Sequence, residues 1–164
     1  MDGKTVADSK LSMSMVMQPN QANPAGNVHG GEIMKLMDNA AFAVAQRHAR
    51  SNVVTARVDE LEFHLPIYVG NLVVCNAYLT YVGRSAMEVA VTIMVDNLYS
   101  EAPAQCALTA YFTLVALNVG GQPIRVPQLE LVTEEEHQLF EEGRQRHETN
   151  KNNKLKKINI STPA

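Results

Sequence analysis

Hydrophobic and polar residues alternate with a period of two near the amino end of the chain. The segment LSMSMVM, residues 11–17, sets one leucine and three methionines against two serines and a valine, which is typical of a half-buried strand. After a loop of Asn, Pro and Gly, residues 31–49 lack proline and, beyond Gly31, lack glycine. They are rich in Met, Leu, Ala, Lys and Gln and predict a long helix of about five turns.

Four apolar segments follow in close succession. They are enriched in Val, Ile, Thr, Tyr and Phe and cover residues 52–64, 71–83, 84–97 and 102–118, so they favour strands over helices. Short connections indicate antiparallel neighbours, because a parallel return needs a crossover of a dozen or more residues. A helix that is apolar nearly all round must be covered by more than one surface. We therefore predict an α+β fold in which a curved antiparallel sheet wraps around the long helix.

The chain becomes polar after residue 130. Thr133 stands three residues before Glu136, the spacing of a capping box, and predicts a solvent-facing C-terminal helix over residues 131–150. We expect residues 151–164, with their four lysines, to form a polar tail and residues 1–10 to form a flexible N-terminus. Residues 11–130 then form the single folded domain.

Composition and charge exclude several classes of function. The 164 residues carry a formal net charge of −3, which gives no basic footprint for nucleic acid. No apolar run reaches the about 20 residues of a membrane span, and no secretory signal is present, so we expect a cytoplasmic, soluble protein with no membrane partner. The two cysteines lack a CxxC spacing and no two histidines stand four residues apart, so we expect reduced, buried thiols and neither a metal nor another cofactor.

One carboxylate, Asp38, stands in the middle of the apolar helix. The residues three and four positions away, which share its face, are Met34, Lys35, Ala41 and Phe42. A capping role is disfavoured, because Asp38 lies seven residues beyond Gly31 and caps act in the first turn. Two interpretations remain open: a surface aspartate paired with Lys35, or a partly buried carboxylate held for chemistry as a base or nucleophile.

The start of the same helix offers complementary chemistry. Gly30 and Gly31 allow the backbone to approach a ligand closely, and the unpaired N–H groups of a helix start suit an anion or a developing oxyanion. Asp38 lies about 10 Å further along the helix axis. A reaching side chain, a water or a second chain must therefore bridge the gap, and the sequence leaves the choice open.

Three separated motifs resemble the hotdog-fold acyl-CoA thioesterases of the acyl-CoA hydrolase group. They are ANPAGNVHGGEIMKLMDNAA at 22–41, VVTARVDELEFHLPIYVGNLV at 53–73 and VGRSAMEVAV at 82–91. They occur in family order and spacing, and the resemblance covers about residues 10–118. It implies a hotdog fold, the curved sheet around one helix predicted above, and hydrolysis of acyl-CoA to a free acid and CoA without a cofactor.

The resemblance also implies roles for individual residues. The catalytic carboxylate falls on Asp38, and an assisting asparagine in the preceding loop falls on Asn23. Backbone N–H groups near Gly30 or Gly31 would polarise the thioester carbonyl, and Thr55 matches a threonine near the site in the partner subunit. A site shared between two subunits would close the gap between the helix start and the carboxylate.

The turn of Gly83, Arg84 and Ser85 resembles the family turn that contacts CoA, where a guanidinium can bind phosphate with two parallel hydrogen bonds. Three positions depart from the family pattern. His29 replaces an aromatic residue before the paired glycines, and we assign it to substrate binding rather than to catalysis. Ala86 removes a hydroxyl from the turn, and Leu36 replaces an aromatic residue near the acyl pocket.

Two other functions fit this fold. A sensor that binds acyl-CoA without cleaving it would not need Asp38 beside Asn23, and a hotdog dehydratase would usually need a histidine base, for which only His29 is placed. We interpret His64 as structural. Exposed edge strands and a shared site predict self-association as a dimer or as a trimer of dimers, that is, a hexamer.

Overall fold

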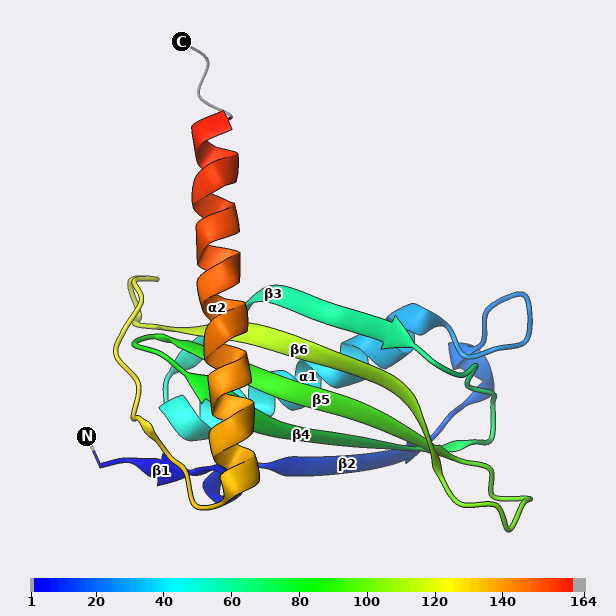
Figure 1. Cartoon of the computed structure of the whole chain (residues 1–164). Coiled ribbons are helices and arrows are strands. Elements are labelled where there is room, and N and C mark those ends of the chain that lie inside the picture. Colours follow the sequence, from blue (N-terminus) through cyan, green and yellow to red (C-terminus); the bar gives the residue numbers. More distant parts are fainter. Residues whose placement is uncertain (1, 161–164) are drawn as a thin grey trace.

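The main sheet of the chain is antiparallel and has five strands, with a helix on each face. The computed structural model describes residues 2–160. The sheet has the strand order β2-β4-β5-β6-β3, and the long helix α1 (Gly30–Ala49) lies behind it in Figure 1, with the second helix α2 (Glu134–Ile160) in front. The strands are β2 (Leu11–Val16), β3 (Asn52–Phe63), β4 (Leu72–Val82), β5 (Ala86–Asp96) and β6 (Gln105–Leu117). The predicted hotdog arrangement, its strands and its central helix are confirmed.

The helix α1 is the centre of the hydrophobic core. Its buried positions recur at intervals of three and four residues along one broad stripe. They are Ile33, Leu36, Met37, Ala40, Ala41, Val44, Ala45 and His48. Three of the eight are alanines at positions 40, 41 and 45, so the sheet can pack closely on the central turns of the helix. Asp38 lies outside this stripe and is only half-buried.

The helix α2 begins as predicted but extends further. The Glu136 N–H donates to Thr133 Oγ1 at 3.2 Å and the Thr133 N–H donates to Glu136 Oε2 at 3.2 Å, which confirms the capping box. The helix then continues through Ile160, so the expectation of a tail from residue 151 is wrong for residues 151–160. Residues 161–164 lie outside the described part of the chain. In Figure 1 the last turns of α2 pass beyond strand β3.

The N-terminus is more ordered than its composition suggests. Strand β1 (Lys4–Thr5) pairs in parallel with β7 (Leu129–Glu130), and the Lys4 Nζ donates to the carbonyl of His48 at 2.6 Å. The buried His48 ring in turn bonds the Pro127 carbonyl through Nε2 at 2.8 Å. These contacts over long sequence separations attach residues 4–8 to the domain. The expectation that residues 1–10 form a flexible N-terminus is therefore wrong for residues 4–8. A two-residue strand is too short for a periodic pattern to reveal it.

Two further expectations concern membrane-spanning helices and the cysteine thiols. Within residues 2–160, no helix is long and apolar enough to cross a membrane. Cys75 is buried in β4, and burial raises the pKa of its thiol to about 12; Cys106 is half-buried and free. Cys75 therefore stays protonated as a core residue.

Candidate active site

Asp38 and Thr55 meet where α1 packs beside the edge strand β3. The Thr55 hydroxyl donates a hydrogen bond of 2.7 Å to Asp38 Oδ1. The acceptor is thus held by a β-branched side chain with few rotamers, while the other carboxylate oxygen has no partner among the side chains described, those of residues 2–156. The alternative interpretation, an ion pair with Lys35, is not met among the described side chains. Thr55 contacts Asp38 of its own chain, which differs from the partner-subunit placement that the resemblance implied.

Apolar side chains flank this carboxylate and are left uncovered. Met34 and Phe42, one turn before and after Asp38, are 40% and 38% exposed, and Val54 beside Thr55 is 42% exposed. Exposed apolar side chains on both a helix and an unpaired edge strand form a patch of the kind that protein contacts cover. Asp38 therefore lies among exposed apolar side chains of α1 and β3.

The loop before α1 is shaped by Asn23. Its Oδ1 accepts the N–H groups of Ala25 and Asn27 at 3.0 and 3.2 Å, so the turn-forming role of an asparagine is present. These bonds use only the carbonyl of the side-chain amide. The Nδ2 group makes no hydrogen bond within the described chain. It is therefore a free donor on a side chain whose orientation is fixed by the bonds to Oδ1.

The two glycines at the start of α1 differ in their free donors. The His29 Nδ1 accepts the Gly31 N–H at 3.1 Å, so His29 is the N-cap of the helix. The Gly30 N–H, in contrast, has no acceptor within residues 2–160. Of the two predicted oxyanion donors, Gly30 is therefore the better placed, because its N–H is already aligned and unused.

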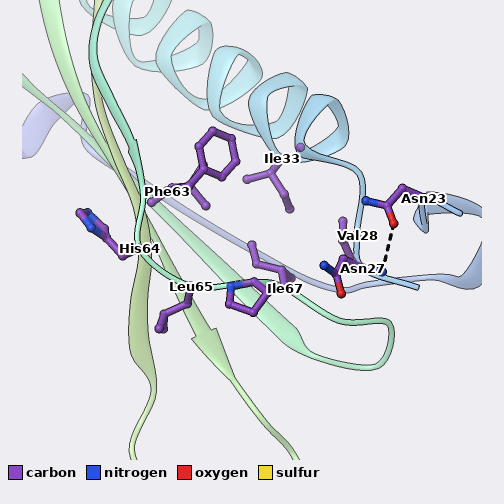
Figure 2. A pocket seen from close by; sticks show the side chains of 11 residues that line it. Asn23, Asn27, Val28, Ile33, Phe63, His64, Leu65 and Ile67 are labelled. Carbon is purple, nitrogen blue, oxygen red and sulfur yellow. Dashed lines mark hydrogen bonds between the residues drawn. The ribbon is translucent and has the colours of Figure 1, made fainter. Parts of the chain in front are cut away.

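A pocket of 360 Å³ lies between Asn23 and the start of α1 at Gly30. Figure 2 shows the side-chain amides of Asn23 and Asn27 on one side of the pocket. The side chains of Phe63, His64 and Leu65 lie on the other side. Its remaining lining is mostly aliphatic, from Val28, Ile33, Ile67 and Leu108, with the backbone of Gly30. An apolar pocket with a few convergent polar groups is the usual form of a small-molecule site. Asp38 and Thr55 do not line it.

The predicted CoA turn lies elsewhere, between β4 and β5. Its backbone is fixed by hydrogen bonds, including the Gly83 N–H to the Ala86 carbonyl at 2.8 Å and the Ala116 N–H to the Ser85 carbonyl at 2.9 Å. Gly83 and Arg84 line a cavity of 620 Å³ that Arg125 also lines. Neither Arg84 nor Arg125 forms an ion pair in the described chain, so two guanidinium groups are free for anions there.

The predicted residues thus form three groups. They are Asp38 with Thr55, Asn23 with the helix start at residues 29–31, and the turn of residues 83–85. Sequence reasoning interpreted His64 as structural, although it lines the pocket wall, and it did not consider Arg125 beside the turn. His64 reaches the pocket because the chain after β3 returns to the helix start, where the Val28 N–H donates to the Ile67 carbonyl at 2.7 Å. No periodic pattern encodes such a loop contact.

Comparison with known proteins gives the family. The profile of the Thioesterase superfamily matches residues 25–102. The chain is 39% identical over 144 residues, 87% of its length, to the cytosolic acyl coenzyme A thioester hydrolase of Rattus norvegicus, and it spans 38% of that relative. It is 35% identical to the uncharacterized acyl-CoA thioester hydrolase YkhA of Bacillus subtilis, with 90% of this chain and 85% of YkhA covered.

Solved structures agree with the architecture. An apo-hexameric acyl-CoA thioesterase superposes with a TM-score of 0.87 and 31% identity over 93% of this chain and 97% of the other. The acyl-CoA hydrolase of Staphylococcus aureus, solved with butyryl coenzyme A, coenzyme A and coenzyme A disulfide, gives 0.86 and 30% over 96% and 95%.

Three variants of the Staphylococcus aureus enzyme bear on individual positions. In them an asparagine, an aspartate and a threonine are each replaced by alanine, and the three residues are 15 and 17 positions apart. Asn23, Asp38 and Thr55 have the same separations in this chain. Sequence, fold and comparison agree, and the chain belongs to the thioesterase superfamily.

Proposed function

We propose that this protein is an acyl-CoA thioesterase, which hydrolyses acyl-CoA to a free carboxylic acid and CoA. The observation that carries the proposal is the bond from Thr55 to Asp38 in the middle of an apolar helix, at the sequence separations found in the Staphylococcus aureus acyl-CoA hydrolase. A carboxylate in such surroundings is costly to a fold. A hydrolytic role explains why it is kept.

Each part of the site has a chemical task in this reaction. Asp38 either removes a proton from the attacking water or attacks the thioester carbon itself. The Gly30 N–H, at the positive end of the α1 dipole, stabilises the oxyanion that develops on the carbonyl oxygen, and the free amide of Asn23 orients the water or the thioester. In the first route the water oxygen adds to the carbonyl carbon as Asp38 takes its proton, and the C–S bond breaks when the tetrahedral intermediate collapses, with that proton passing to the departing thiolate. In the second route Asp38 forms an acyl–aspartyl anhydride as the thiolate leaves, and water then hydrolyses the anhydride, with one water proton going to the thiolate.

The separation of Asp38 from the Asn23 pocket supports a site made by two chains. Strand β3 is an edge strand of 12 residues, and exposed Val54, Val58 and Phe63 lie along it. Pairing of β3 with a second copy would cover these residues and bring Asp38 of one chain to the pocket of the other. We propose a dimer of this kind, assembled further into a trimer of dimers. A light-scattering mass equal to one chain contradicts this arrangement.

The decisive test is release of free thiol from acyl-CoA substrates of increasing chain length. The proposal requires steady turnover of at least one of them, and the panel then gives the chain-length preference. Binding of acyl-CoA without turnover identifies the protein as a sensor instead. Hydration of an enoyl-CoA, measured in parallel, tests the dehydratase reaction.

Thr55→Val is expected to lower kcat about tenfold while KM changes little. Valine keeps the shape of threonine but removes the donor to Asp38 Oδ1, and a lost hydrogen bond to a charged group costs about 1.5–3 kcal/mol. Thr55→Ser keeps the hydroxyl and should retain most of the activity. The measurement is the rate of thiol release by both variants, with Thr92→Val on β5, outside all the sites described, as the control. Equal rates for the valine and serine variants contradict a role for the hydroxyl.

A further inference from the structure

A third hollow lies on the face of the sheet that carries α2, beneath the last turns of that helix. It has a volume of 780 Å³, the largest of the cavities described above. Small side chains from three strands form its floor, among them Ala56, Ala86 and Val115, and Lys151, Lys154 and Lys156 of α2 form its wall. We call this hollow the lysine groove. Its size is within the range of small-molecule sites.

The lysine groove is strongly basic in a protein of net negative charge. No aspartate or glutamate is among its described lining residues, which do include Arg57 and His147. Arg57 is already bound to Asp59 Oδ1 at 2.5 Å, whereas the three lysines form no ion pair within the described chain. Their ammonium groups are therefore free for an anionic ligand.

Helix geometry directs these cations to the groove. His147, Lys151 and Lys154 are spaced by four and three residues, so they share one face of α2. Basic residues near a helix C-terminus also complement the helix dipole, but the dipole explains only their position along the axis. It does not explain why they share a face above a floor of small side chains that leaves a hollow open.

We propose that the lysine groove binds the phosphate groups of a nucleotide-sized organic phosphate. The ammonium groups would hold the phosphates, and the small, partly apolar floor would take the remainder of the molecule. Two sources have this chemistry: the nucleotide end of the CoA substrate, which rests on the proposed function, and a free nucleotide. Ala56 directly follows Thr55, and Ala86 directly follows the turn of residues 83–85, so the groove adjoins both segments assigned to substrate.

The test is a binding titration of the full chain with adenosine 3′,5′-bisphosphate, with adenosine as the probe that lacks phosphate. The double variant Lys151→Gln/Lys154→Gln is compared with Lys10→Glu, which changes the net charge equally at an exposed residue outside the groove. We expect the bisphosphate Kd to rise about tenfold or more in the double variant and to stay within about twofold in Lys10→Glu. Far-UV circular dichroism verifies that α2 remains helical.

The outcomes separate the sources and the two proposals. A raised KM for acyl-CoA with unchanged kcat in the double variant assigns the groove to the nucleotide end of the substrate, and an unchanged KM assigns it to a free nucleotide. If the wild type releases no thiol but binds bisphosphate, and the double variant loses that binding, the proposed function is refuted and the groove proposal is supported. The groove proposal is overturned if the wild type binds bisphosphate no better than adenosine, or if the double variant binds it as tightly as Lys10→Glu.

Discussion

Asp38→Asn is expected to lower kcat for thiol release by about 10³-fold, because general-base or nucleophilic groups contribute about 10² to 10⁴ in rate. Asparagine has nearly the same shape and can still accept the Thr55 hydroxyl at the site of the present 2.7 Å bond. It cannot take a proton from water or attack a carbonyl. The loss should therefore appear in kcat, with KM for acyl-CoA nearly unchanged.

The matched control is Asp2→Asn, the same chemical change at an exposed residue near the amino end. It should leave kcat unchanged. Thermal unfolding of both variants verifies that the fold is kept, and removal of the half-buried charge at position 38 is expected to leave the protein as stable as the wild type or more so. Substantial turnover by folded Asp38→Asn would show that another group is the base and that the carboxylate has a different purpose.

The fold could be predicted well because its main elements are long and strongly patterned. The segment 71–83 became β4 at Leu72–Val82 and the segment 31–49 became α1 at Gly30–Ala49, so each end differs by at most one residue. Helix α2 was underestimated because residues 151–156 are exposed, and a helix face in water has no apolar period to detect. Strand β1 was missed because its stability comes from partners more than a hundred residues away.

The site could be predicted only in parts. Asp38 was found because a charge in an apolar helix conflicts with its surroundings, and such conflicts mark functional positions. Its bond to Thr55 spans 17 residues and depends on which strand packs beside α1, which the pattern of one strand does not determine. The same holds for His29. We expected it to contact a ligand, and its ring is the N-cap of α1.

The attachment of α2 to the sheet depends on a buried ion pair. Glu88 of β5 is 4% exposed, and Arg146 of α2 donates to its two carboxylate oxygens at 2.8 and 3.1 Å. The Thr80 hydroxyl adds a third hydrogen bond to Glu88 at 2.7 Å, and the guanidinium lies 3.8 Å from the centre of the Tyr111 ring. Burial by itself would lower the pKa of Arg146, but the hydrogen bonds and charge of Glu88 outweigh it and raise that pKa.

The packing at this point leaves no space for adjustment. A Cβ atom added to Gly143 would lie 2.7 Å from the Cβ of Tyr81 and 2.8 Å from Glu88 Oε1, so only glycine allows the helix to approach the sheet this closely. The carboxylate of Glu88 is therefore buried beneath α2, where the loss of its charged partner is costly.

Arg146→Met is expected to lower the free energy of unfolding by about 3–5 kcal/mol, because it leaves a buried carboxylate without its partner. Adding Glu88→Gln removes that charge, so the double variant should recover most of the loss. Urea unfolding at one protein concentration measures both. Arg144→Met is the control, since it makes the same change on the same helix at an exposed ion pair with Glu141 and Glu148, and it should not shift the midpoint measurably. If the double variant is no more stable than Arg146→Met, contacts of the arginine stem, and not the charge on Glu88, hold α2 against the sheet.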